Sequence, residues 1–131
     1  MAHAVEEVEA MAGLARALAI DPDLLFLDEP TAGLDPIGAA AFDEQTRQLQ
    51  SILGLTVFLI THDLDTLYSI CDRVAVLADR HVIAVGTIDE LLATQHPWIQ
   101  EYFNGPRGRA AISSQKKGAA HHDVSPGKDS A

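Results

Sequence analysis

The pattern of apolar and polar residues predicts a helix, a strand and a second helix in the first part of the chain. Apolar residues recur at helical spacing from Val5 to Leu18, with glutamates on the other faces, and predict an amphipathic helix that ends before Pro22. The apolar run LLFLD at 24–28 predicts a short buried strand. An aspartate and a proline at 35–36 then mark the start of a helix that is expected to end at Gly54.

A second apolar run, TVFLIT at 56–61, predicts another strand directly after this helix. A strand, a helix and a strand, with both strands apolar throughout, are typical of a βαβ unit in a parallel sheet that is covered on both faces. The predicted fold class is therefore α/β.

The second half of the chain is predicted to contain a hairpin and short helices. A short helix follows His62, and the apolar runs RVAVLAD and HVIAVG are joined so tightly that they predict a β-hairpin. Thr87 and Glu90 have the spacing of a capping box, which predicts a helix over 88–95. Pro97 is expected to open a further short helix.

Residues 105–131 are predicted to form a disordered tail, and residues 1–104 a folded domain. The tail is rich in Gly, Ser, Ala and Pro and has almost no large apolar side chain, so it cannot bury enough surface to offset the entropy of ordering. Its Lys116-Lys117 pair could serve a lipid surface and its His121-His122 pair a metal. A solvated tail is the simpler interpretation of both pairs.

Charge and composition restrict the class of protein. Residues 1–104 hold seventeen acidic residues against four basic ones, and a body of this charge should repel nucleic acid. No apolar run approaches the roughly 18 residues that a membrane span needs, and the start MAHAVEEVEA lacks the features of a secretory signal. Cys71 is the single cysteine, which excludes an internal disulfide. These features predict a cytoplasmic protein.

Polar residues follow both predicted strands of the parallel unit. Asp28 and Glu29 come after the first strand, and His62 follows the second, so the three are expected at one edge of the sheet. An aspartate there can hold a hydrated Mg²⁺, the next carboxylate can orient and deprotonate a water molecule, and a histidine can reach a terminal phosphate. The set predicts phosphoryl transfer to water. A strand that ends at a solvent-exposed acidic turn is the alternative interpretation of the two carboxylates alone.

The order of several segments gives the set a more specific meaning. LLFLDEPTAGLDP and then THD, with ARAL before them and RVAVLADRHVIAVGTIDEL after them, resemble the C-terminal half of an ABC transporter ATP-binding subunit over about residues 14–104. The resemblance implies a P-loop NTPase-like nucleotide-binding domain, with its N-terminal part missing, that binds ATP and Mg²⁺ and hydrolyses ATP. By this resemblance Asp28 closes the Walker B strand and binds the metal, Glu29 is the catalytic carboxylate, and His62 is the switch histidine. Asp35 belongs to the D-loop, which touches nucleotide and the partner subunit.

The resemblance also implies partners and a place in the cell. Such subunits work as dimers with a second ATPase subunit beneath a transmembrane permease, on the inner face of the plasma membrane. The run DELLATQHPWIQEYFNGPRGRAA is similar to the C-terminal end of subunits in the Mce/Mla branch, which drive phospholipid transport between bacterial membranes. In the alternative interpretation, the aromatic residues of this run only pack a terminal helix against the domain.

The sequence departs from the family pattern in two respects. A phosphate-binding loop needs the pattern G-x-x-x-x-G-K-[ST], and no lysine occurs before Lys116. The positions where the family carries a sequence close to LSGG read AVEE, at 4–7. The chain alone is therefore expected to be inactive, and an absent central strand is expected to leave unpaired strand edges. Two alternatives stay open: a non-catalytic interaction module, and an ATPase of the DNA-repair or chromosome-structure type, for which basic surface in the body would be expected.

Overall fold

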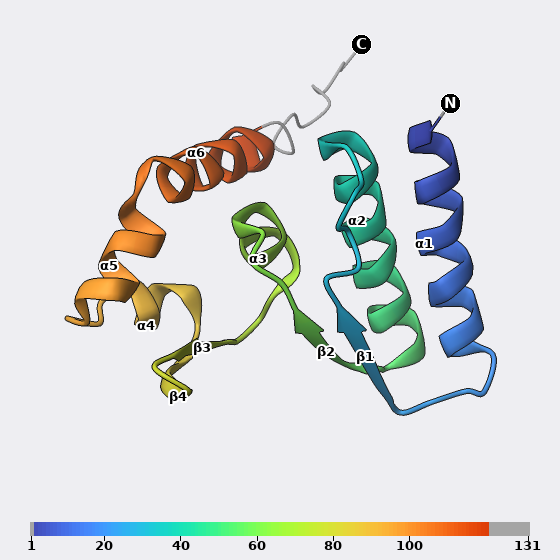
Figure 1. Ribbon diagram of the computed structural model, residues 1–131, viewed down its shortest axis with the longest axis horizontal. Helices are drawn as coiled ribbons and strands as arrows, with labels where there is room; N and C mark the ends of the chain where they lie inside the picture. The colour runs from blue at the N-terminus through green and yellow to red at the C-terminus, as the bar shows by residue number, and fades with distance from the viewer. Residues whose placement is uncertain (1, 121–131) are drawn as a thin grey trace, which may run out of the picture. The chain divides into compact units, whose positions relative to one another are not determined.

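The computed structural model describes residues 2–120 and divides the chain into two compact units, Met1–Ile70 and Cys71–Ala131 (Figure 1). The first unit contains α1 (Ala2–Leu18), β1 (Leu24–Asp28), α2 (Pro36–Leu53), β2 (Thr56–Ile60) and α3 (Leu64–Ile70). The second unit contains β3 (Val74–Ala78), β4 (His81–Gly86), α4 (Ile88–Leu92), α5 (Pro97–Asn104) and α6 (Pro106–Ala120). Within the described residues, no helix has the length and apolar character to cross a membrane.

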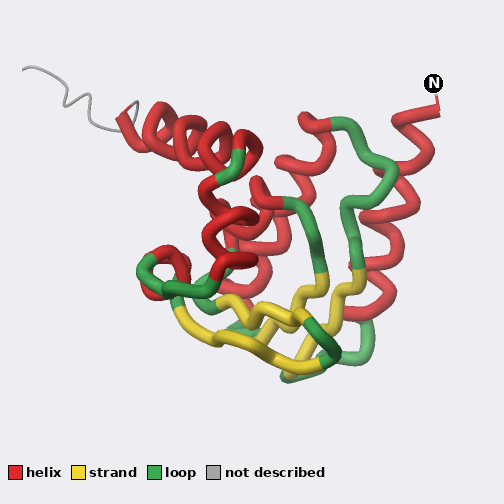
Figure 2. The backbone as a smooth tube through the Cα atoms, turned by 60° about the vertical axis from the view of Figure 1, so that its left-hand side comes forward, coloured by secondary structure: helices red, strands yellow, loops and turns green. Residues whose placement is uncertain are grey.

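The first unit is built on the predicted βαβ arrangement. Strands β1 and β2 pair in parallel, in a register that matches Leu24 with Thr56 and Asp28 with Ile60, and α2 connects them (Figure 2). The α/β fold class is confirmed. Among residues 2–120 the strands form two separate two-stranded sheets, β1 with β2 and β3 with β4. The outer edges of β1 and β2 therefore lack a strand partner within the described part of the chain.

A small apolar core joins three elements of the first unit. Leu14 of α1, Leu25 of β1 and Phe42 of α2 form one buried cluster, and each is at most 4% exposed. Figure 1 shows α1 and α2 running side by side next to this strand pair. The spacing of apolar residues in both helices follows from this contact, since one stripe of each helix faces the cluster.

The expectation that both faces of the parallel pair are covered is wrong for the described residues. Successive side chains of a strand point to opposite faces, so Leu25 is buried while its neighbour Phe26 is 66% exposed. Phe58, which pairs with Phe26 across the strands, is 54% exposed, and the two ring centroids lie 5.4 Å apart. Leu24 and Ile60 extend the same exposed face. A continuous apolar strand thus does not prove two covered faces.

Both ends of α2 are fixed by the residues that the sequence pointed to. Asp35 is the N-cap, and its carboxylate accepts a hydrogen bond of 2.7 Å from the backbone N–H of Gly38. At the other end Gly54 has φ 66°, a left-handed conformation that glycine adopts without a steric penalty, and its N–H donates to the carbonyl of Gln50. These predictions are confirmed.

The hairpin of the second unit is also confirmed. Strands β3 and β4 pair antiparallel, and Asp79 and Arg80 alone connect them, both with positive φ. At the start of α4, the backbone N–H of Thr87 donates to the Glu90 carboxylate and the N–H of Glu90 donates to the Thr87 hydroxyl. The capping box is as predicted, but the helix ends at Leu92 and not at position 95.

The structure differs from the predicted disordered tail over residues 106–120, which form α6. Ala111 on this helix is only 2% exposed, and Gly108 is so close to the carbonyl of Phe103 that a Cβ atom there would collide with it. Small residues therefore let α6 approach α5 closely, which large apolar side chains would prevent. Residues 121–131, with the His121-His122 pair, lie outside the described part of the chain.

Candidate functional site

Strand pairing brings the ends of β1 and β2 to one edge of the first unit. Asp28 is the last residue of β1 and is matched with Ile60, the last residue of β2. The backbone N–H of Glu29 continues the ladder by donating to the carbonyl of Ile60 at 2.8 Å. His62 follows two residues later. The register of two parallel strands thus places Asp28, Glu29 and His62 at the same edge, as the sequence predicted.

Glu29 and His62 are in direct contact. Nδ1 of His62 lies 2.6 Å from Oε1 of Glu29, so the ring N–H donates to the carboxylate. The Glu29 side chain is 35% exposed and that of His62 is 83% exposed, so the pair is accessible from solvent. A carboxylate and an imidazole at this distance can together orient a water molecule and move its proton.

The backbone at Glu29 is strained. Its φ of 45° lies in the left-handed region, which residues other than glycine adopt only when their surroundings hold them there. The ladder bond to Ile60 on one side and a turn, in which the N–H of Ala32 donates to the carbonyl of Glu29 at 3.1 Å, hold it in place. This geometry turns the Glu29 side chain away from the direction that a continued strand would give it.

Asp35 has different surroundings from this pair. The carboxylate of Asp35 is used to cap α2 and lies at the start of that helix.

Within residues 2–120, no three His, Cys, Asp or Glu side chains lie close enough together to hold a metal ion by themselves. A hydrated Mg²⁺ needs only one or two carboxylates when water and phosphate oxygens supply the other ligands. Asp28, exposed at the end of β1, is chemically able to supply one such carboxylate.

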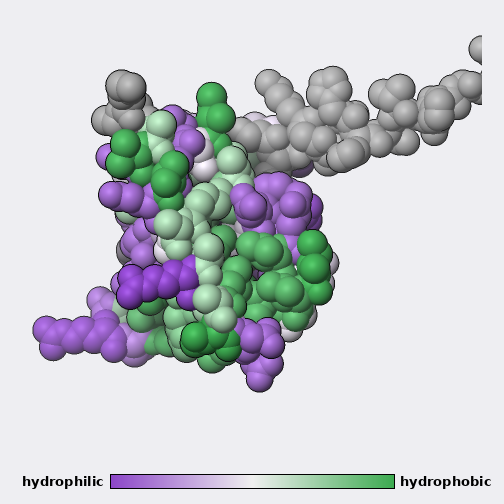
Figure 3. Space-filling view, turned by 90° about the vertical axis from the view of Figure 1, so that its right-hand side faces the viewer, coloured by the Kyte–Doolittle hydropathy of each residue, from purple (hydrophilic) through white to green (hydrophobic). Residues whose placement is uncertain are grey.

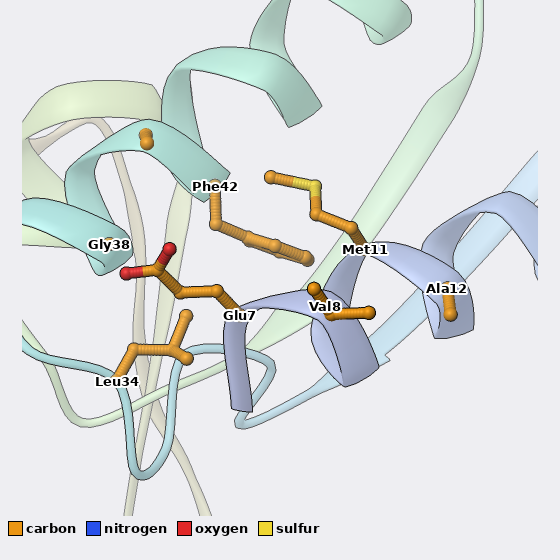
Figure 4. Close-up of a pocket in the computed structure, with 8 residues that line it drawn as sticks. Glu7, Val8, Met11, Ala12, Leu34, Gly38 and Phe42 are labelled. Carbon is orange, nitrogen blue, oxygen red and sulfur yellow. The ribbon is translucent and has the colours of Figure 1, made fainter. Parts of the chain in front are cut away.

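A pocket of about 490 Å³ lies elsewhere in the first unit, between α1 and α2 (Figure 4). Its walls are mostly apolar, with Met11 and Phe42 on facing helices, and the Glu7 carboxylate points to the first turn of α2, where a Cβ on Gly38 would collide with it. A helix N-terminus is a favourable place for a carboxylate. The surface formed by α1 mixes hydrophobic and hydrophilic residues (Figure 3). None of Asp28, Glu29 and His62 lines this pocket, so it is not the site of the predicted chemistry.

Sequence reasoning missed a buried polar pair between α2 and α3. Asp43 is 4% exposed and Thr66 is 1% exposed, and the Thr66 hydroxyl donates to Oδ2 of Asp43 at 2.7 Å. The other oxygen, Oδ1, has no hydrogen-bond partner among the described residues. Its position in the sequence could have indicated that Asp43 is buried. Asp43 lies beside Phe42 and one turn before Thr46, on the buried stripe of α2. A carboxylate on such a stripe must be paired or protonated, or it lowers the stability of the fold.

Burial raises the pKa of Asp43 above its ordinary value of 3.8, and the negative charges of Asp63 and Asp65 raise it further, while the Thr66 hydrogen bond lowers it. Between the unfolded and the folded pKa, the folded chain binds more protons, so the contribution of Asp43 to stability grows as the pH falls through that window.

We therefore expect Asp43→Asn to stabilise the chain more at neutral pH than at about pH 4. The amide can still accept the Thr66 hydrogen bond, but it carries no buried charge. Urea unfolding of both proteins at a series of pH values measures the difference in the free energy of unfolding. A difference that stays constant with pH would show that Asp43 titrates at its ordinary pKa.

Comparison with solved structures defines the class of fold. The structure of CbiO1 from Clostridium perfringens, part of the ABC transporter complex CbiONQ, matches with a TM-score of 0.56 and 33% sequence identity. The match covers 78% of this chain and 40% of that protein. The chain thus has the α/β fold of P-loop NTPase-like nucleotide-binding domains. No protein-family model matches the sequence.

Sequence comparison gives the family. The chain is 34% identical to the intermembrane phospholipid transport system ATP-binding protein MlaF of Escherichia coli strain K12 over 116 residues, which cover 88% of this chain and 43% of MlaF. It is 49% identical to the methionine import ATP-binding protein MetN of Streptomyces coelicolor over 82 residues, which cover 63% of this chain and 23% of MetN. The chain is therefore a homologue of part of the ABC transporter ATP-binding proteins. It spans less than half the length of these curated relatives.

Proposed function

We propose that this chain provides the hydrolytic residues of an ATP-binding subunit of an ABC transporter. The observation that carries the proposal is the contact of 2.6 Å between His62 and Glu29 at the carboxyl edge of a parallel strand pair. In an open parallel sheet, ligands bind beyond this edge. Glu29 acts as the catalytic carboxylate, and His62 holds Glu29 and meets the terminal phosphate.

Each residue of the edge has a separate task in this proposal. Glu29 accepts a proton from a water molecule that it orients toward the terminal phosphate. Asp28 would hold Mg²⁺ through water, and the ion, when bound with ATP, neutralises charge on the phosphate oxygens. Asp35, at the start of α2, lies on the segment that would face the nucleotide and a second subunit. The strained backbone at Glu29 supports a functional role, because such strain is concentrated at active sites.

The 131 residues alone are not expected to hold ATP. They contain no G-x-x-x-x-G-K-[ST] pattern, and the positions at 4–7 carry two glutamates in place of a glycine pair. Backbone N–H groups and a positively charged lysine normally bind the phosphates. Negatively charged carboxylates cannot replace them. A complete ATP site would therefore need a phosphate-binding segment that these 131 residues do not contain.

We assign the transported substrate to the phospholipid class, with a transmembrane permease and a second ATPase subunit as partners. The matched part of MlaF covers a larger share of this chain than that of MetN, 88% against 63%. The segment similar to the C-terminal end of Mce/Mla subunits includes α5, where the rings of Trp98 and Tyr102 stack at 4.9 Å. The protein would work in the cytoplasm, on the inner face of the plasma membrane. The seventeen acidic residues of the body argue against a nucleic-acid partner.

The experiment that tests the proposal compares the chain alone with the chain joined to the N-terminal part of MlaF. The joined protein should hydrolyse ATP in the presence of Mg²⁺. The chain alone should bind fluorescent ATP with a Kd above about 10 µM, if it binds at all. Tight binding by the chain alone would contradict the assignment of the missing phosphate site. A joined protein that folds and binds ATP without hydrolysing it would contradict the roles of Glu29 and His62.

One observation favours a second function, a non-catalytic interaction module. The face that carries Phe26 and Phe58 is apolar and more than half exposed at both rings, and exposed apolar faces often bind other proteins. A pull-down of an intact ATPase or permease by the Glu29→Ala variant would support this function. If the Glu29→Ala variant no longer captures these proteins, the result would support the catalytic function.

A further inference from the structure

We propose that Asp43 and Thr66 are positioning residues that hold His62 against Glu29. The hydrogen bond between them connects the helix that follows the Glu29 loop with the helix that follows His62. The catalytic meaning of this link rests on the proposed function, whereas the link itself is a statement about the fold of the first unit.

The link lies close to His62 along the chain. Helix α3 begins at Leu64, two residues after His62, and Thr66 is in its first turn. Thr66 is 1% exposed and donates to Asp43 at 2.7 Å. Asp43 lies two turns into α2, whose start is fixed by the Asp35 cap. A change in the position of α3 relative to α2 must therefore move the residues that lead into α3.

The connection between His62 and α3 has little freedom to absorb such a change. The backbone N–H of Asp63 donates to the hydroxyl of Thr61 at 3.0 Å, and the carboxylate of Asp63 accepts from the N–H of Asp65 at 2.9 Å. Leu64 and Leu67 are each 9% exposed and anchor the same helix in the core. His62 is thus held between the end of β2 and a helix whose register against α2 is set by Thr66.

Stability alone does not account for a carboxylate at position 43. Its Oδ1 atom is buried without a partner among the described residues, and the two nearby carboxylates that act on it, Asp63 and Asp65, are repulsive. A buried carboxylate without an ionic partner costs desolvation free energy that an apolar side chain does not cost. An apolar side chain at position 43 cannot accept a hydrogen bond from Thr66. This directional bond fixes the position of α3 against α2 and therefore the position of His62.

The test uses the complete 131-residue chain and follows the imidazole resonances of His62 by NMR, assigned with His62→Gln. Glu29→Ala defines the resonances of a His62 that has lost its contact. Thr66→Val, which keeps the shape but removes the hydroxyl, should move the resonances most of the way to that position, and Thr66→Ser should restore them. Thr66→Ala takes the place of Thr66→Val if the valine variant does not fold.

The matched control is Thr46→Val on the same helix α2. Thr46 is 3% exposed, and its hydroxyl donates to the carbonyl of Phe42 within its own helix at 2.9 Å and not to a residue of α3. Thr46→Val should leave the His62 resonances unchanged. Equal changes in Thr46→Val and Thr66→Val, or none in either, would overturn the proposal.

The same variants in the protein joined to the N-terminal part of MlaF separate a positioning role from a structural one. Thr66→Val should lower kcat roughly tenfold and leave the KM for ATP unchanged, with recovery in Thr66→Ser. An unchanged kcat in Thr66→Val would overturn the catalytic meaning of the link. If the joined wild type hydrolyses no ATP, the proposed function fails, and the spectra of the chain alone still decide whether the link positions His62.

Discussion

Glu29→Gln is expected to lower ATP hydrolysis by the joined protein by roughly a hundredfold to ten-thousandfold and to leave ATP binding unchanged. Glutamine keeps the size of the side chain and can still accept a hydrogen bond from Nδ1 of His62, which lies 2.6 Å from the present carboxylate oxygen. It cannot take a proton from water. The loss should therefore appear in kcat, measured by phosphate release, and not in the affinity for fluorescent ATP.

Glu44→Gln is the matched control for this substitution. Glu44 is an exposed carboxylate on α2 that accepts hydrogen bonds from Arg47 and Gln48. It has no role in the proposed chemistry. Its replacement should leave kcat within about twofold of the wild type. If Glu29→Gln behaves like Glu44→Gln, Glu29 is not the catalytic carboxylate, and the contact with His62 has only a structural role.

Phe42→Ala is expected to reduce the free energy of unfolding by about 3–5 kcal/mol. Phe42 is 2% exposed and lies in a buried cluster that joins α1, β1 and α2 through Leu14 and Leu25. Removal of the ring leaves a cavity at the point where the three elements meet. Since a whole domain is stable by only about 5–15 kcal/mol, the variant should unfold at much lower urea concentration than the wild type.

Ile37→Ala is the control on the same helix. Ile37 is 83% exposed, so its truncation should change the free energy of unfolding by no more than about 0.5 kcal/mol. Similar effects of Phe42→Ala and Ile37→Ala would mean that the Leu14–Leu25–Phe42 cluster does not stabilise the first unit in solution.

The parts of the fold that could be predicted are those fixed by local sequence. Asp35 and Gly54 set the ends of α2 through backbone geometry that neighbouring residues alone determine. The location of Glu29 and His62 at one edge was predictable for a related reason, since two parallel strands in register bring their ends together. Their direct contact is shown by the structure alone. The family resemblance of LLFLDEPTAGLD and THD was confirmed by the relatives, while the roles of the individual residues stay predictions.

The parts that could not be predicted depend on what packs against what. The strand LLFLD is apolar at every position before the aspartate, and nothing in it says that Phe26 lies on an open face. Helix α6 forms in a segment whose one large apolar residue is Ile112. Gly108 and Ala111 fit against α5, which composition alone does not show. The Asp43–Thr66 pair spans 23 positions in the sequence, and a spacing of that length carries no local signal.

The open face of the β1–β2 pair has a consequence for how the chain behaves in solution. Phe26 and Phe58, together with the two edges of this strand pair that have no strand partner among residues 2–120, favour contact between copies. A net charge of −10 opposes that contact. Electrostatic repulsion reaches about 10 Å at 0.1 M salt and only about 3 Å at 1 M salt. Ionic strength thus controls the balance, so dilute buffer should preserve dispersed molecules and concentrated salt should drive them to aggregate.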